Sequence, residues 1–279
     1  MGGPAAIGGM SVSVQSTSYI DQDSDNSSLE ILRSMFKMLE ESGVDLPEAL
    51  GSDINNLLDD PQAFYQRLVG DLDPVSLGNF NAIMGNVELD QLDPAATAET
   101  LTAIANGALE PGSPDYNRVM NQVEEFMGTF KANVGEGSDA SRAAGELPEN
   151  SLTKQVVGPL FDAADAQAAK VDSLLSTLKG YNERVKEGQD AIASGDAGRM
   201  RDYLLKYTDQ DASELANKAP GQLKELIEND MDHVGGLGEI KQIELQQAMA
   251  MLQVIYSTAA GVVDAVKQAT NRAANAIGN

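Results

Sequence analysis

The sequence predicts a mainly α-helical protein built around a long antiparallel coiled-coil hairpin. An N-terminal helical domain precedes the hairpin, and a small helical insert lies between its two long helices. Two stretches with heptad spacing of apolar residues, within 151–189 and 239–279, predict the hairpin. Aromatic residues make up only 5% of the chain and Trp is absent, which suits thin helix–helix seams better than a wide β-sandwich.

The chain begins with a segment that we interpret as disordered, residues 1–26. This segment is rich in Gly, Ser and Asp and shows no helical period. Order is expected from Ser27, because Ser27 and Glu30 form a capping box in front of an apolar helical face. The N-terminal helical domain is predicted to span 27–134.

Four helix starts in this domain are marked by a capping side chain directly before a proline. The capping oxygen accepts a backbone hydrogen bond, and the fixed φ of proline suits the first helical turn. The four marked starts are Asp60–Pro61, Asp73–Pro74, Asp93–Pro94 and Ser113–Pro114.

Residues 135–150, which follow this domain, show no apolar period and are predicted to form a linker.

The first coiled-coil helix is assigned to the segment 151–189 and is expected to run from about Pro159 to Gln189. Gln167 occupies the one polar position of its seam. The seam residues, which are predicted to form the intramolecular coiled coil, are Leu160, Ala164, Val171, Leu174, Leu178, Tyr181 and Val185.

Residues 190–238 form the predicted insert, with two amphipathic helices and a closing Gly-Gly-Leu-Gly sequence at 235–238. If the two long helices pack antiparallel, the chain leaves along the first, forms the insert as a small cap, and returns along the second.

The second coiled-coil helix, 239–279, contains an uncharged stretch from Ala248 to Val263. A membrane span needs roughly 20 predominantly apolar residues, and this stretch is shorter and is interrupted by Gln253, Ser257 and Thr258. Its apolar residues follow one another in steps of three and four, so we expect the helix to face another helix rather than lipid.

The formal net charge is −24 and is concentrated in the first half of the chain. Residues 1–150 hold 25 acidic and 6 basic residues, whereas residues 151–279 hold 18 and 13. This surface repels nucleic acid and anionic lipid, so no nucleic-acid partner is expected and membrane contact is at most indirect. Cys is absent, which excludes disulfides and thiolate sites. The first ten residues lack the basic region and the sustained apolar region of a cleavable signal peptide, so Sec-type export is not expected.

The sequence contains no pattern typical of a catalytic, cofactor or metal site. Asp21, Asp23 and Asp25 match the start of a calcium loop, but Asn26 and Leu32 replace its required Gly and Glu. His233 is the only histidine and is interpreted as a helix-end residue. We therefore expect no enzyme, no cofactor and no metal site.

The layout and two heptad segments resemble the needle-tip proteins of bacterial type III secretion systems. The segments are 239–279 and FDAADAQAAKVDSLLSTLKGYNERV, residues 161–185. The resemblance implies a secreted homo-oligomer at the bacterial cell surface, exported unfolded, with needle or filament subunits and translocator proteins as partners. It also implies a self-association or needle-docking face: Ile243, Leu245, Met251, Leu252, Val254, Ile255, Val262, Val263, Val266, Lys267 and Ile277.

Other interpretations remain open at this point. The tip family commonly has mixed α/β knobs, whereas the N-terminal segment here predicts short helices. The chain could instead be an extracellular filament subunit of the same systems, a membrane-active translocator, or an intracellular coiled-coil scaffold.

Overall fold

The computed structural model describes Lys37, residues 111–149 and residues 151–277, and within these ranges it contains helices and no strand. The mainly α-helical fold with a long helical hairpin is confirmed. The predicted disordered segment 1–26 and the predicted helix starts at Asp60, Asp73 and Asp93 lie outside the described residues. The described helices are α6 (Pro114–Val134), α7 (Asp139–Glu146), α8 (Leu152–Ser194), α9 (Ala197–Tyr207), α10 (Ala212–Ala216) and α11 (Pro220–Ile277).

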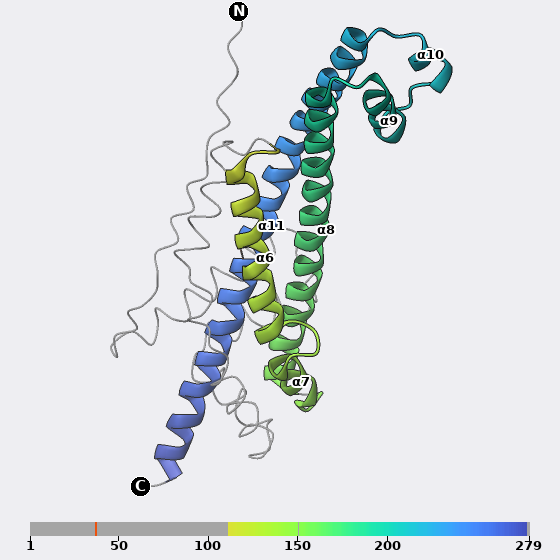
Figure 1. The fold of residues 1–279 in the computed structure, drawn as a ribbon. Helices are drawn as coiled ribbons and strands as arrows, with labels where there is room; N and C mark the ends of the chain where they lie inside the picture. Colours follow the sequence, from red (N-terminus) through yellow and green to blue (C-terminus); the bar gives the residue numbers. More distant parts are fainter. Residues whose placement is uncertain (1–36, 38–110, 150, 278–279) are drawn as a thin grey trace, which may run out of the picture.

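Helices α8 and α11 lie side by side and run in opposite directions (Figure 1). Gln167 on α8 donates from Nε2 to the Ala248 carbonyl at 2.9 Å, and Arg184 donates from Nε to Asp230 Oδ2 at 2.9 Å. A later residue of α8 therefore meets an earlier residue of α11, as an antiparallel pair requires. The bond to Ala248 also satisfies the one polar residue of the predicted seam.

Helix α8 is longer than the sequence predicted. It begins at Leu152 because Ser151 caps it, accepting a hydrogen bond from Lys154 N at 3.2 Å. Pro159, the expected first residue, instead lies inside the helix, where its missing N–H leaves one carbonyl of the preceding turn without its usual partner. The helix continues past Gln189 and ends at Ser194, and the following Gly195 has a φ of 66°, the left-handed conformation typical of a helix C-cap.

Helix α11 is continuous, so the prediction of a break at 235–238 is wrong. Glycines often end a helix by adopting a positive φ, but none of the glycines at 235–238 does so. Val234 on one side and Gln242 on the other are buried, and this packing holds the helix together through the glycines. His233 consequently lies in the interior of α11 and not at a helix end, and the insert shrinks to α9, α10 and their connections.

The predicted linker at 135–150 contains a helix, α7, so that prediction is also wrong. Ser138 caps it by accepting from Ser141 N at 3.1 Å. Its buried residues are Ala140, Ala143 and Ala144. Alanines pack closely against a neighbouring helix, yet they give a weak apolar period in a sequence otherwise rich in Gly and charged residues.

Helix α6 packs on the hairpin, although the sequence placed it in a separate N-terminal domain. The Tyr116 hydroxyl donates to the Leu178 carbonyl of α8 at 2.7 Å, and burial raises the pKa of this phenol. Ion pairs join Lys131 to Asp172 and Lys179 to Glu124. The ring of Phe130 contacts that of Tyr256 on α11 edge-on, with 6.0 Å between centroids. Helices α6, α8 and α11 thus form a three-helix bundle along part of the hairpin (Figure 1).

The described chain has two separate apolar cores. The first, which we call the bundle core, contains buried residues of α6, α7, α8 up to Leu178, and α11 from Leu245 onward. The second, which we call the cap core, joins α9 and α10 to the adjoining ends of the two long helices. Its buried members are Ala191, Met200, Tyr203, Leu204, Leu215, Leu223 and Ile227.

The close approach of the two long helices near the cap gives a first testable prediction. A Cβ at Gly188 would lie 2.9 Å from Met231 Sδ and 3.2 Å from Ile227 Cγ2. Gly188→Val should force α8 and α11 apart and lower the free energy of unfolding by about 2 kcal/mol, a typical cost of overpacking. Urea unfolding measures this change.

The matched control is Gly180→Val on the same helix. Beyond the backbone of α8 itself, nothing lies within 4 Å of a Cβ at that position. The control should therefore be no less stable than the native chain, since valine forms helix slightly better than glycine. Equal loss of stability in both variants would contradict the close packing at Gly188.

Candidate functional site

The structure buries six of the seven residues predicted to form the intramolecular seam on α8. The seventh, Tyr181, is half-buried against the bundle core. The buried residues are Leu160, Ala164, Val171, Leu174, Leu178 and Val185.

The predicted docking residues on α11 divide into distinct groups. Leu245, Leu252 and Ile255 are completely or almost completely buried in the bundle core, so they hold the single chain together and are not a free surface. Met251 and Val254 are half-buried and pack against the same core. The reason is geometric, because the seam positions of α11 face α8 and α6 of the same chain and their side chains are buried between these helices.

The remaining predicted docking residues follow in the last part of α11. Their backbone is helical, but their side chains lie outside the described residues, so their placement stays a prediction. They are Val262, Val263, Val266, Lys267 and Ile277.

Among the described side chains of α11, two large apolar ones are exposed, Ile240 and Ile243, each with 55% of its surface accessible. Side chains three residues apart share one face of a helix, so the two isoleucines form one exposed patch. Ile243 was predicted from the sequence, whereas Ile240 was missed. The i, i+3 spacing could have identified Ile240, which lies at the very start of the helix predicted at 239–279 but well inside α11.

The C-terminal end of α11 runs past the beginning of α8. Leu152 lies fifteen residues before Gln167, and Val263 lies fifteen residues after Ala248, the residue that Gln167 contacts. The first residue of α8 therefore falls level with Val263. Helix α11 continues to Ile277, which adds roughly 20 Å of helix at about 1.5 Å per residue. Figure 1 shows this end projecting beyond α7 and α8.

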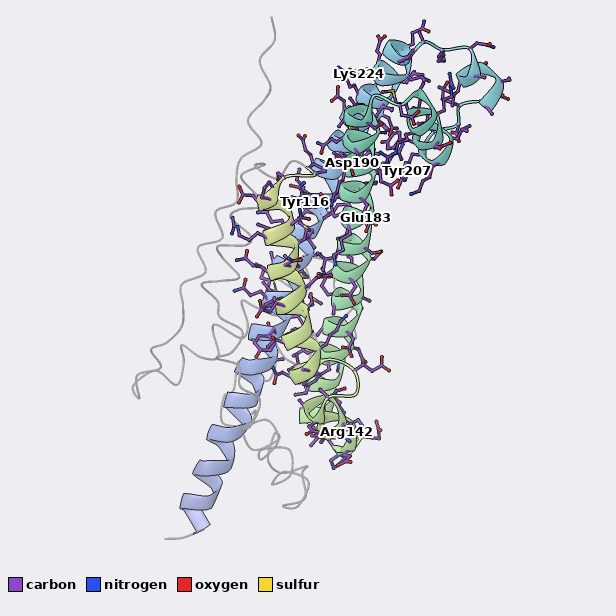
Figure 2. The ribbon with its side chains drawn as sticks, in the orientation of Figure 1. Tyr116, Arg142, Glu183, Asp190, Tyr207 and Lys224 are labelled. Atoms are coloured by element: carbon purple, nitrogen blue, oxygen red, sulfur yellow. The ribbon has the colours of Figure 1, made fainter. Side chains whose placement is uncertain are left out.

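A polar cluster fastens the cap to the hairpin. Arg184 of α8 donates from two nitrogens to the carboxylate of Asp230 on α11, and also donates to the Tyr207 carbonyl at 2.6 Å. The Tyr203 hydroxyl donates to Asp230 Oδ2 at 2.7 Å, and its pKa is raised by burial and by that carboxylate. Figure 2 shows Tyr207 where α9 meets the hairpin.

An outer layer of this cluster is exposed to solvent. Lys206 donates to both carboxylate oxygens of Glu187, at 2.9 and 2.8 Å, which raises the pKa of Lys206 and lowers that of Glu187. The Lys206 ammonium and the Arg184 guanidinium both lie near the Tyr207 ring, 4.7 and 5.2 Å from its centroid. Each charge in this network is paired, so the arrangement stabilises the junction and presents no free nucleophile or base.

Within the described residues, no group of three or more His, Cys, Asp and Glu side chains is placed to hold a metal ion. His233 is exposed on α11. The acidic segment that begins at Asp21 lies outside the described residues. No helix in the described ranges combines the length and the apolarity needed to cross a membrane.

The chain was compared with protein-family models, with curated proteins and with solved structures, and none of them matches.

Proposed function

We propose that this chain is a non-enzymatic, secreted assembly protein whose second long helix binds further copies of the chain and a needle of the type III secretion kind. The observation that carries the proposal is the exposed isoleucine pair, Ile240 and Ile243, on α11, the longest of the described helices. Exposed apolar patches that share one helix face are typical of protein–protein contacts.

The C-terminal end of α11 supports the same proposal. This end continues beyond α8, and its sequence keeps apolar residues at heptad positions, among them Val262, Val266 and Ile277. A helix with a sustained apolar seam gains stability when another helix covers it. A second copy, or a helical needle subunit, supplies such a partner at this end.

Electrostatics sets a condition on this assembly. Copies that each carry a formal net charge of −24 repel one another, and salt screens that repulsion. Association through apolar surface should therefore strengthen as the ionic strength rises, which is the opposite of the behaviour expected for a contact made by ion pairs.

Co-sedimentation with needle filaments tests the tip function. The full chain should pellet with preformed needles, and electron microscopy should show added mass at the needle end. Long fibres formed by the chain alone would favour the filament subunit instead. Flotation of the chain with phosphatidylcholine liposomes, in the absence of needles, would favour the membrane-active translocator. No pelleting with needles in low or high salt would contradict the tip proposal.

A further inference from the structure

Helix α8 carries an uncharged stripe on the side opposite to its seam. Each residue of this stripe follows a seam residue by two positions, and at about 100° per residue that spacing places it on the opposite side of the helix. All of its residues are small and exposed, although 22% of the chain is charged and exposed positions usually carry residues such as Lys and Glu. The residues of this surface, which we call the small stripe, are Ala166, Ala169, Ser173, Ser176 and Gly180.

Helix α11 carries a second uncharged stripe of the same length. Its residues are exposed, recur in steps of three and four, and lie opposite to the buried Leu245 and Ala248. Each stripe covers fifteen residues, which corresponds to roughly 20 Å of helix at about 1.5 Å per residue. The residues of this second surface, which we call the isoleucine stripe, are Gly236, Ile240, Ile243, Gln247 and Ala250.

The two stripes lie at the same level of the hairpin, on its opposite edges. Gln167 of α8 contacts Ala248 of α11. The small stripe ends thirteen residues after Gln167, and the isoleucine stripe begins twelve residues before Ala248, so the two are level in the antiparallel pair. One hairpin therefore presents two large apolar side chains on one edge and a row of small side chains on the other.

The stripes of two different copies fit each other. If neighbouring copies point the same way and stand level, the isoleucine stripe of one runs antiparallel to the small stripe of the next, as α11 does to α8 within the chain. Ile240 and Ile243 then fall level with residues 172–175 of the neighbour, where the small side chains of Ser173 and Ser176 leave room for them. Large side chains that enter the gaps between small ones allow two helices to pack closely.

The charges beside the two stripes match in this arrangement. Lys170 is exposed and forms no ion pair with any residue that the structure describes. Glu244 is 39% exposed and is paired with Lys241 of its own helix. Lys170 and Glu244 each lie three residues before a member of their stripe, Ser173 and Gln247, so they flank the stripes on equivalent sides, which meet in an antiparallel pair. In the level register Lys170 of one copy falls within one residue of Glu244 of the next, and their attraction favours this orientation.

We infer that the isoleucine stripe of one copy docks on the small stripe of the next copy. This inference rests on the proposed self-association and names the partner surface that the isoleucine pair binds. The contact joins two different surfaces and is therefore heterologous. Each added copy leaves one stripe of each kind free, so the assembly grows until it closes into a ring or continues as a filament.

A variant with Ser173→Glu and Ser176→Glu tests this docking. Glutamate forms helix better than serine, so the variant should fold, but its carboxylates would have to be buried under the isoleucines of the next copy. In light scattering at high salt it should stay at the monomer mass of 29.5 kDa at concentrations where the native chain associates.

The matched control carries Ala132→Glu and Ala193→Glu. It adds the same charge at exposed positions outside both stripes, so it should associate as the native chain does. Circular dichroism and urea unfolding check that both variants keep the native fold.

Mixing two variants tests whether the contact is heterologous. The variant Ile240→Asp, Ile243→Asp keeps its small stripe, and the variant Ser173→Glu, Ser176→Glu keeps its isoleucine stripe. Each should be a monomer alone, and an equimolar mixture should form a dimer that grows no further, because the dimer has no intact stripe left free.

The outcomes separate this inference from the proposed function. If the variant Ser173→Glu, Ser176→Glu associates as the native chain does, or if the mixture stays monomeric, the docking on the small stripe is overturned while self-association of the native chain stands. A native chain that is monomeric at every concentration would overturn the self-association and the docking together.

Discussion

Leu252→Asp is expected to unfold the bundle formed by α6, α8 and α11. Leu252 has no accessible surface and lies in the bundle core. The substitution removes a buried leucine, which costs about 2–5 kcal/mol, and places an uncompensated carboxylate in its position, which adds several kcal/mol more. We expect loss of most helical circular dichroism at neutral pH, or at least a large fall in the urea midpoint.

The matched control is Ile243→Asp on the same helix. Ile243 has 55% of its surface exposed, so the same charge should change the free energy of unfolding by no more than about 0.5 kcal/mol. If Leu252→Asp were as stable as Ile243→Asp, Leu252 would not be part of the intramolecular core.

Arg184→Met is expected to have the second-largest effect, centred on the cap. The Asp230 side chain is only 9% exposed and Arg184 is 23% exposed, so the substitution leaves a largely buried carboxylate with the Tyr203 hydroxyl as its remaining contact in the cluster. Removing one partner of a buried ion pair lowers the free energy of unfolding by about 3–5 kcal/mol. Because Arg184 is partly exposed, we expect a loss near the lower end of this range, about 3 kcal/mol. Urea unfolding measures the loss, and hydrogen exchange should show faster opening of α9.

The double variant Arg184→Met, Asp230→Asn separates the charge from the packing. It removes the unpaired carboxylate and keeps an oxygen that accepts from Tyr203. It should therefore be more stable than Arg184→Met alone. A double variant that is less stable than the single one would show that the uncompensated charge is not the cause of the loss.

The heptad pattern was sufficient to predict the hairpin and much of its seam. Residues such as Leu174 and Leu252 recur in steps of three and four, and that spacing alone places them on one helix face. Even the polar position Gln167 was predicted, although its bond to Ala248 was not. Periodicity shows which face of a helix is apolar but not which helix covers it.

That limit explains why the position of α6 was missed. Its start at Ser113 was predicted from the cap, and Ser113 does accept a hydrogen bond from Tyr116 N at 3.2 Å. Nothing in the sequence showed that Tyr116 and Phe130 pack against helices that follow much later in the chain. Because α6 directly follows the N-terminal helices in the sequence, it was predicted to belong to their domain. In the structure it packs on α8 and α11 instead.

Helix ends were harder to predict than helix faces, for a related reason. Pro159 and the glycines at 235–238 are local signals for a start and a stop, each with an intrinsic cost of a few kcal/mol or less. Burial of an entire helix face outweighs such costs, and both signals were overridden. Tertiary packing also explains why part of the predicted docking face is not available for docking. Leu245, Leu252 and Ile255 are buried inside the chain.

We propose that this chain associates with itself through the exposed face of α11 that carries Ile240 and Ile243, while the apolar seam of α11 stays internal. Light scattering across a concentration series, in low and in high salt, tests it most directly. The native chain should show a mass that rises with concentration and with salt, whereas Ile240→Asp, Ile243→Asp should remain a folded monomer under all conditions. A native chain that stays at the monomer mass of 29.5 kDa throughout, or a variant that associates as the native chain does, would contradict the claim.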